Sequence, residues 1–169
     1  MLCPNCQVQM TALSLNSHLG RSVGIEICSN CQAFWFDKYE SLQLTEASVS
    51  ELFGVVKQAS QGKPAVRLSL GAKCPRCDRR LRVMHDMQKS TRFEYLGCPN
   101  DHGRLITFFN FLREKNFIKP LSQEQIEELR EKLRTVNCSN CGAPVDLAHR
   151  TTCEHCHSPL SMVEWKEPE

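Results

Sequence analysis

Paired cysteines are the residues of this sequence best suited to chemistry. The chain has 169 residues and eleven cysteines, and ten of the cysteines form pairs with two residues between the partners. Two thiolates at this spacing can face one metal ion from a tight turn, here called a knuckle. Two knuckles joined by a β-hairpin supply four tetrahedral ligands. The five pairs are Cys3/Cys6, Cys28/Cys31, Cys74/Cys77, Cys138/Cys141 and Cys153/Cys156.

These cysteines fall into three groups, each with ligands for one metal ion. Twenty-one residues separate the two pairs of the first group, and eleven separate those of the last. The middle group has one pair and, twenty residues later, the run Cys98-Pro99-Asn100-Asp101-His102. His102 lies where the second knuckle is needed, whereas the rival ligand His85 lies inside the expected hairpin. The predicted ligand sets are Cys3, Cys6, Cys28 and Cys31; Cys74, Cys77, Cys98 and His102; and Cys138, Cys141, Cys153 and Cys156.

The ligand types restrict the metal and its chemistry. Four thiolates, or three with one imidazole, suit zinc or rubredoxin-like iron. Three closed sites in one chain favour structural zinc over electron transfer, so we expect three Zn²⁺ ions per chain. No coordination position stays open for water or substrate, and no thiol is left as a nucleophile. We therefore expect a protein that is not an enzyme and has no small-molecule substrate.

Cysteine usage and hydropathy indicate the cellular compartment. An odd number of cysteines cannot all pair as intramolecular disulfides, and clustered cysteines hold metal more often where thiols stay reduced. No basic, apolar and small-residue series marks a secretory signal. The longest apolar stretch, residues 106–112, is too short to span a bilayer. We therefore expect a soluble cytoplasmic protein with no membrane partner.

The spacing between knuckles also predicts the fold. A segment of roughly 20 to 40 residues rarely forms a sufficient hydrophobic core without a metal. Alternating apolar residues predict strands at 23–27, 81–84 and 93–96. Near-equal spacing in the first two groups, each followed by an aromatic run (34–36 and 108–111), indicates an internal repeat. We predict a small metal-dominated α+β fold of three zinc ribbons, which are short antiparallel β-hairpins with zinc knuckles, joined by short α-helices.

Capping boxes predict where the helices begin. In such a box a small polar residue is followed three positions later by an acid or an amide, and the two side chains cap the first turn. The second expected helix is supported by an apolar stripe at helical intervals, and the third by a hydrophobic staple. The boxes are Asp37/Glu40, Ser48/Glu51 and Ser122/Gln125, the stripe is Leu52, Val55, Val56 and Ala59, and the staple is Leu121 with Ile126.

These elements divide the chain into five segments. The stretch from about residue 61 to residue 73 contains Gly, Pro and Ser and no knuckle, so it is the expected linker. A second junction is expected near residue 135. The segments are 1–44 (zinc ribbon 1), 45–72 (helix and linker), 73–120 (zinc ribbon 2 with a following helix), 121–135 (connecting helix) and 136–169 (zinc ribbon 3).

The first segment resembles a known family. Residues 3–6 read Cys-Pro-Asn-Cys, and residues 28–40 read Cys-Ser-Asn-Cys-Gln-Ala-Phe-Trp-Phe-Asp-Lys-Tyr-Glu. Over about residues 1–44 this pattern is similar to the transcription-factor-IIB-type zinc-ribbon (zinc-finger) family of prokaryotic proteins. The resemblance implies that the four cysteines are ligands, that Trp35 packs against the site, and that Asp37 and Glu40 begin a helix. The second segment is a degenerate copy, and the third resembles the knuckles of many unrelated chains.

The chain departs from this family at Gln7, Gln32 and Ala33, where the family prefers glycine. Glycine suits these positions because they often need a positive φ, which points backbone N–H groups at the thiolates. Glutamine and alanine adopt a positive φ less readily than glycine, so the first site departs from the family pattern at its knuckles. Gly142, after Cys141, keeps the expected glycine.

Charge is distributed unevenly along the chain. The formal net charge is +2 with neutral cysteines. Eleven thiolates would lower it by eleven and three Zn²⁺ ions would raise it by six, which gives −3. Residues 73–92 nevertheless carry seven cations against two aspartates. The candidate nucleic-acid-binding residues are Lys73, Arg76, Arg79, Arg80, Arg82, Lys89 and Arg92. The alternative is that these cations only keep an exposed hairpin soluble.

Three functions remain open at this point. The first is a non-catalytic zinc-ribbon adaptor or regulator that binds a protein partner, in a transcription-related context. The second is direct DNA or RNA binding through residues 73–92. The third is a redox- or zinc-responsive sensor, in which oxidation of a site releases its metal.

Overall fold

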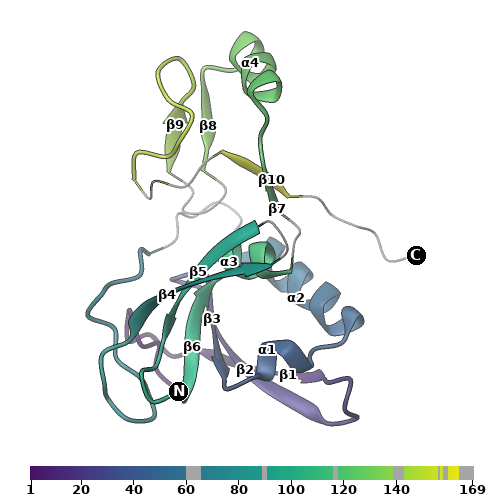
Figure 1. Ribbon diagram of the computed structural model, residues 1–169, viewed down its shortest axis with the longest axis vertical. Helices are drawn as coiled ribbons and strands as arrows, with labels where there is room; N and C mark the ends of the chain where they lie inside the picture. Colours follow the sequence, from purple (N-terminus) through teal and green to yellow (C-terminus); the bar gives the residue numbers. More distant parts are fainter. Residues whose placement is uncertain are drawn as a thin grey trace.

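The computed structural model describes residues 1–59, 66–88, 91–115, 118–138, 143–155, 157 and 160–163. Its main body is a six-stranded antiparallel sheet in the order β1-β2-β3-β6-β5-β4 (Figure 1). The strands of this sheet are β1 (Thr11–Asn16), β2 (Ser22–Cys28), β3 (Ala33–Asp37), β4 (Arg82–Gln88), β5 (Thr91–Gly97) and β6 (Gly103–Thr107). The helices are α1 (Glu40–Gln43), α2 (Glu46–Ala59), α3 (Phe108–Glu114) and α4 (Gln123–Lys132). The prediction of a mixed α+β fold with antiparallel strands is confirmed.

The first two cysteine groups share this one sheet. In the first group, β1 and β2 follow the first knuckle and β3 follows the second; in the second group, β4 and β5 follow the first knuckle and β6 follows the second. The two halves meet where β3 pairs with β6, with Trp35 opposite Leu105, so the strand order is symmetric about this pair. The expected hairpins are present as β1–β2 and β4–β5. The internal repeat is therefore visible as two similar halves joined edge to edge.

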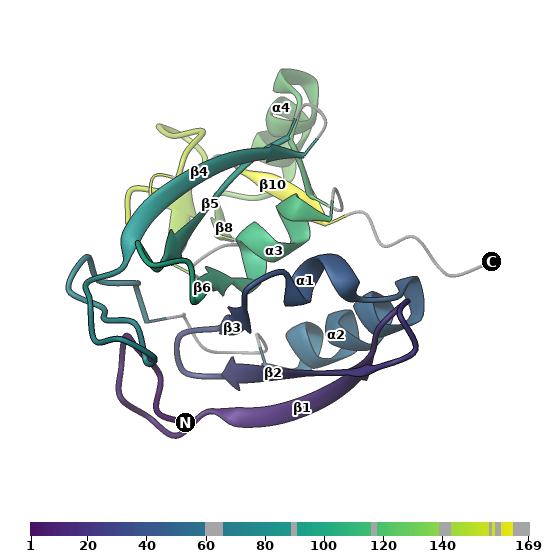
Figure 2. The same ribbon diagram turned by 60° about the horizontal axis from the view of Figure 1, so that its bottom comes forward.

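One face of the sheet packs against helices. Figure 2 shows the sheet curving around α1, α2 and α3. Phe34 and Phe36 of β3 point to this face and meet Phe111 of α3, with ring centroids 5.1 and 5.6 Å apart. Leu52 and Val56 of α2 are buried in the same core. This core contains none of the predicted metal ligands, and it is larger than the core that a single zinc ribbon is expected to have.

The opposite face carries the cysteines. Trp35 and Leu105 lie here, in a second core that also holds Cys3, Cys28, Cys74 and Cys98. Trp35 lies between Phe34 and Phe36 on β3 but points to the other face, because neighbouring side chains of a strand point to opposite faces of the sheet. The sheet thus separates an apolar, helix-covered core from a cysteine-rich one.

Two helix starts differ from those predicted. Helix α1 begins at Glu40, and only half of its predicted box is present: the N–H of Asp37 donates to Oε2 of Glu40 at 2.6 Å. Helix α2 begins at Glu46 rather than after Ser48, because Thr45 Oγ1 accepts from the N–H of Ser48. The third prediction is confirmed, since Ser122 and Gln125 form a complete capping box at the start of α4.

The two aromatic runs are not equivalent elements, so that part of the predicted repeat is wrong. Residues 34–36 lie in β3, but residues 108–111 begin α3. The strand that corresponds to β3 is β6, which directly follows His102. Thr107 at the end of β6 caps α3 by accepting from the N–H of Asn110 at 3.1 Å, so the chain turns into a helix there.

Part of the expected linker is packed rather than free. The N–H of Ser69 donates to Oδ1 of Asn5 at 2.7 Å, and the carbonyl of Arg67 accepts from Asn5 Nδ2 at 3.0 Å. Ala72 is buried in the cysteine-rich core. The segment from Val66 onward therefore runs along the first knuckle. Residues 60–65, which include Gly62 and Pro64, lie outside the described residues.

The last part of the chain projects from the sheet as a separate lobe (Figure 1). Its described strands form two small antiparallel pairs, β8–β9 and β10–β7. A third apolar cluster holds Cys138, Cys153, Val145 and Leu147. These strands are β7 (Ile118–Pro120), β8 (Thr135–Asn137), β9 (Pro144–Asp146) and β10 (Ser161–Val163).

Candidate metal centres

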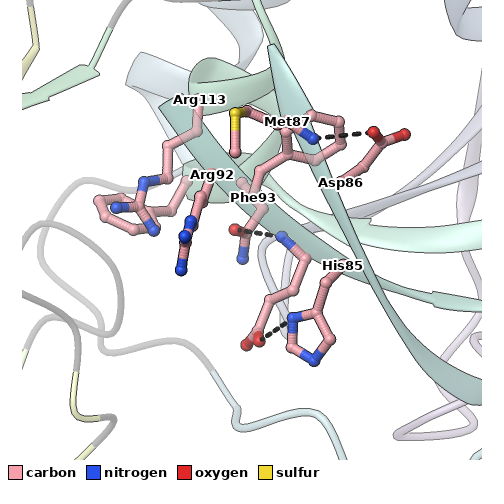
Figure 3. A pocket seen from close by; sticks show the side chains of 9 residues that line it. His85, Asp86, Met87, Arg92, Phe93 and Arg113 are labelled. Carbon is pink, nitrogen blue, oxygen red and sulfur yellow. Dashed lines mark hydrogen bonds and ion pairs between the residues drawn. The ribbon is translucent and has the colours of Figure 1, made fainter. Parts of the chain in front are cut away.

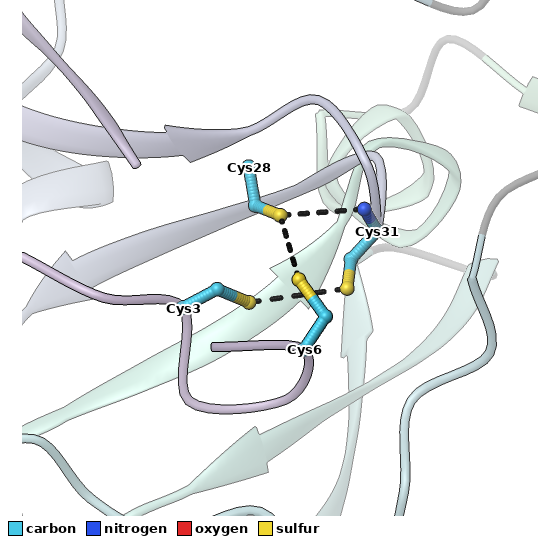
Figure 4. Close-up of side chains that lie close together, drawn as sticks. All are labelled: Cys3, Cys6, Cys28 and Cys31. Atoms are coloured by element: carbon cyan, nitrogen blue, oxygen red, sulfur yellow. Dashed lines mark hydrogen bonds between the residues drawn. The ribbon is translucent and has the colours of Figure 1, made fainter. Parts of the chain in front are cut away.

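The four cysteines of the first group converge on one point (Figure 4). The sulfurs of Cys3 and Cys31 are 3.8 Å apart, and those of Cys6 and Cys28 are 3.5 Å apart. A tetrahedral zinc ion with Zn–S bonds of about 2.3 Å requires sulfurs about 3.8 Å apart. All four ligand atoms lie within 4.8 Å of one another. The donor set and its spacing therefore fit a tetrahedral metal ion.

The backbone of the first knuckle is arranged around its sulfur. The N–H of Cys3 donates to the carbonyl of Val8 at 2.8 Å, and the N–H of Gln7 donates to the carbonyl of Cys3 at 3.0 Å. The N–H of Asn5 points at the Cys3 sulfur at 3.4 Å. Gln7 has a φ of 62° and Gln32 a φ of 50°. Both glutamines therefore adopt the left-handed conformation for which the resembled family uses glycine.

The second group converges in the same way. The sulfurs of Cys77 and Cys98 are 3.6 Å apart, and Nδ1 of His102 lies 3.6 Å from the Cys98 sulfur and 3.9 Å from the Cys74 sulfur. A zinc ion bonded to sulfur and nitrogen at about 2.3 and 2.0–2.1 Å needs these atoms about 3.6 Å apart. The first knuckle repeats the earlier backbone pattern, with Cys74 N–H to Arg79 O at 2.8 Å. This cluster also fits a tetrahedral ion.

The structure separates the two candidate histidines. His102 directly precedes β6 and lies within the cluster. His85 lies in β4 with an exposed side chain, and its Nδ1 is 3.7 Å from a carboxylate oxygen of Glu94. Of the two, only His102 is placed beside the three cysteines.

Two asparagines that sequence reasoning missed donate to the sulfurs. Nδ2 of Asn5 lies 3.2 Å from the Cys31 sulfur, and Nδ2 of Asn100 lies 3.6 Å from the Cys77 sulfur. Each amide reaches from one knuckle to a sulfur of the facing knuckle, so it supports negative charge on the thiolate. The signal was present in the sequence, because both asparagines follow a Cys-Pro dipeptide.

The crowded thiols cannot all ionise without a cation. Hydrogen bonds from Cys28 and Cys31 lower the pKa of Cys3 to about 2. The hydrogen bond with Cys3 raises the pKa of Cys28 to about 11, and the pKa of Cys31 also rises because of its hydrogen bond with Cys28. Burial raises the pKa of Cys74 to about 11. One thiolate therefore suppresses the ionisation of its neighbours, and four thiolates need positive charge at their centre.

The two clusters lie at opposite ends of the β3–β6 pair. Cys31 precedes Ala33, which pairs with Thr107, whereas His102 precedes Gly103, which pairs with Asp37. Trp35 lies between them, only 2% exposed. A Cβ added at Gly103 would lie 2.7 Å from Cζ2 of Trp35, so only glycine allows this close packing. Trp35 therefore packs between both sites rather than against the first alone.

The third group lies partly outside the described residues. Cys138 and Cys153 are buried together in the third apolar cluster, and Cys141 and Cys156 are not described. The backbone at both described cysteines repeats the knuckle pattern: Cys138 N–H donates to Ala143 O, and His157 N–H donates to Cys153 O, both at 2.8 Å. His157, which follows Cys156, has a φ of 61°.

The predicted nucleic-acid-binding residues do not form one surface but lie in several separate places. Arg76 is paired with Asp37, and Lys73 lies 3.8 Å from Asp78. The structure gathers three others with Pro99 around a shallow surface depression: Arg79, Arg80 and Arg82. Arg92 lines a different pocket, and Lys89 lies outside the described residues.

Comparison with protein-family models, with curated proteins and with solved structures gave no match. The resemblance of residues 1–44 to the transcription-factor-IIB-type ribbon therefore remains a prediction. Among the described helices, none combines the length and the apolar composition that crossing a bilayer requires. The chain is thus defined by its mixed α+β fold and by two Cys/His clusters that can hold metal ions.

Proposed function

We propose that this chain is a non-catalytic zinc protein whose three metal sites are structural, and that it acts as an adaptor or regulator through protein contacts in a transcription-related setting. One observation carries the proposal: both described clusters are closed sets of four protein ligands, built into a hydrophobic core around Trp35. Closed sites stabilise a fold, whereas catalytic zinc keeps a position for water or substrate.

Zinc is the metal that this arrangement supports. Cys₄ and Cys₃His sets are common for structural zinc, and binding energy of the metal becomes folding energy. The backbone pattern at Cys138 and Cys153 supports a third set with Cys141 and Cys156, so we propose three ions per chain. Reduced thiolates of this kind suit the cytoplasm, which is the location that we propose.

A surface between the two halves supports the adaptor role. Residues after β3 and residues of β4 and β5 line a pocket of about 270 Å³. Tyr39, Leu42 and Met84 surround it and are exposed, with Leu42 at 65%. Exposed apolar side chains gathered at a pocket mark protein-binding sites, whereas single ones are ordinary. We propose that a protein partner covers these three side chains.

The test compares two variants in affinity purification from cells that make the protein. Leu42→Asp puts a charge in the proposed contact, and Leu133→Asp puts one at a leucine of similar exposure, 50%, at the end of α4 in the separate lobe. We expect a stoichiometric partner with the wild type and with Leu133→Asp that is lost with Leu42→Asp. If the wild type and both variants co-purify with the same proteins, an adaptor role for this surface is refuted.

Direct nucleic-acid binding is the second candidate. Arg79, Arg80 and Arg82 are exposed, and no acidic partner is found for them among the described residues. Three free guanidinium groups on one surface suit phosphate contacts, whose affinity falls steeply with salt. Titration at two salt concentrations tests this: reversal of these three charges should abolish a salt-sensitive affinity, whereas reversal of Lys132 and Arg134 should leave it intact.

A further inference from the structure

A pocket of about 500 Å³ opens beside the β4–β5 hairpin, away from both metal clusters (Figure 3). Its walls come from the end of β4, the start of β5 and helix α3. Such a volume lies within the range of about 300–1,000 Å³ that small-molecule sites occupy. The residues that matter for the argument are His85, Arg92, Phe93, Glu94, Asn110 and Arg113.

Arg113 is an unusual cation for this position. Its side chain is half-buried, and its Nε atom is buried with no hydrogen-bond partner. Burial lowers the pKa of Arg113, which reports the cost of keeping this charge away from water. The guanidinium lies 5.1 Å from the ring centroid of Phe109, a contact that fixes its position but satisfies no N–H group. A buried donor without a partner costs free energy. The two terminal nitrogens of Arg113 are not buried and have no hydrogen-bond partner among the described residues, so they are the donors that a ligand oxygen can reach.

Arg92 brings a second guanidinium to the same side. Both side chains line the pocket, and in the view of Figure 3 their guanidinium ends extend to the same side of it. Among the described residues, no ion pair is formed by either one. Two carboxylates also line the pocket, those of Asp86 and Glu94. Glu94 lies two residues after Arg92 on β5; its carboxylate is 3.7 Å from Nδ1 of His85, and its charge also acts on Arg113. Since neither carboxylate is within ion-pair distance of Arg92 or Arg113, both guanidinium groups keep N–H donors that an anion can use.

The base of the pocket is rigid. Phe93 and Asn110 are 5% and 7% exposed. Oδ1 of Asn110 accepts from the N–H of Glu94, and its Nδ2 donates to Thr107 Oγ1, both at 3.1 Å. The first of these bonds connects α3 to β5, so the two elements that carry Arg113 and Arg92 are held together. A preformed site loses little entropy when a ligand binds.

We infer that this pocket binds an anion, the phosphate or carboxylate group of a small organic molecule, with the half-buried Arg113 as the anchor and Arg92 as the second contact. The planar guanidinium fork matches two oxygens of either group. The apolar rings of Phe93 and Phe109 leave room for an uncharged body beside the anion. This site is independent of the adaptor role and of the three-arginine surface around Pro99.

The test follows the arginine Nε–Hε signals of the zinc-loaded, ¹⁵N-labelled protein by NMR. Inorganic phosphate and succinate are titrated separately, which distinguishes the two anion classes. Arg113→Lys keeps the charge and removes the fork, and Arg79→Lys is the matched control at the other basic surface. We expect a saturable shift of the Arg92 and Arg113 signals with at least one anion, and an affinity at least about tenfold weaker in Arg113→Lys alone.

Two outcomes would overturn the inference. One is the absence of a saturable shift at Arg113 with both phosphate and succinate. The other is an equal loss of affinity in Arg113→Lys and Arg79→Lys, which would mean that anions only collect on basic surfaces. Retention of the wild-type backbone spectrum in both variants shows that each is folded, so neither outcome can come from unfolding.

Discussion

Asp37 and Arg76 form a two-point ion pair that joins the last strand of the first half to the first knuckle of the second site. Arg76 donates from Nε to Oδ1 at 3.3 Å and from a terminal nitrogen to Oδ2 at 2.7 Å. Asp37 Oδ1 also accepts from Nε1 of Trp35 at 3.0 Å. Lys38 reaches the other knuckle of the same site, 2.6 Å from Asp101. The end of β3 therefore holds both knuckles of the second site.

Asp37→Asn should loosen this connection without removing a ligand. The ion pair is partly exposed, so we expect a loss of about 0.5–1 kcal/mol in the free energy of unfolding, in line with exposed pairs of good geometry. Denaturant unfolding of the zinc-loaded protein measures it. Asp78→Asn is the control, because Asp78 lies 3.8 Å from Lys73 and is highly exposed. Equal effects of the two substitutions would contradict a special role for Asp37.

Gln7→Gly should stabilise the zinc-loaded protein. Gln7 has a φ of 62°, which costs an ordinary residue about 1–2 kcal/mol, while glycine adds a smaller entropy cost of about 0.5–1 kcal/mol. We expect a net gain of roughly 0.5 kcal/mol in unfolding free energy. Gln9 has no positive φ, so Gln9→Gly should destabilise instead. A loss in both variants would show that the glutamine side chain matters more than the backbone.

Asn5→Ala should make the first site release its metal faster. Asn5 donates to the Cys31 sulfur and also holds Arg67 and Ser69, so its loss removes support from both the sulfur and the segment that covers it. Loss of such an outer contact typically weakens a metal site about 10- to 100-fold. The rate of zinc transfer to a coloured chelator measures this. Asn100→Ala should have a smaller effect on the rate of zinc release, because the contact of Asn100 with sulfur is longer and exposed. Faster release from Asn100→Ala than from Asn5→Ala would contradict the role proposed for Asn5.

His102→Ala should remove one metal ion from the chain, and His85→Ala should remove none. His102 lies beside three sulfurs, whereas His85 is exposed on β4. Cobalt substitution gives the most direct comparison, because the visible spectrum of the bound ion depends on its sulfur and nitrogen ligands. We expect His102→Cys to keep the ion with a spectrum shifted toward four sulfurs. An unchanged spectrum in His102→Cys would exclude this histidine as a ligand.

The sequence predicted what depends on neighbouring residues. Cysteine spacing determines a knuckle locally, and the Ser122–Gln125 box is completed within four residues, so both predictions needed no knowledge of the rest of the chain. The pairing of β3 with β6 could not be found this way. It joins residues about 70 positions apart, such as Trp35 and Leu105, and no local pattern specifies which edge strand meets which. The two aromatic runs were predicted to be equivalent because Phe residues suit both a buried strand and a buried helix. They differ because Thr107 caps the start of α3, so the second run forms a helix.

The most direct test of the central claim is the mass of the purified, folded chain measured under native conditions, compared with its mass after denaturation. The difference gives the number and identity of the bound metal ions. We expect three zinc ions per chain, two in the clusters at the ends of the β3–β6 pair and one at the third cysteine group in the separate lobe. A folded chain that carries no metal, or a count other than three, would contradict the three-site assignment.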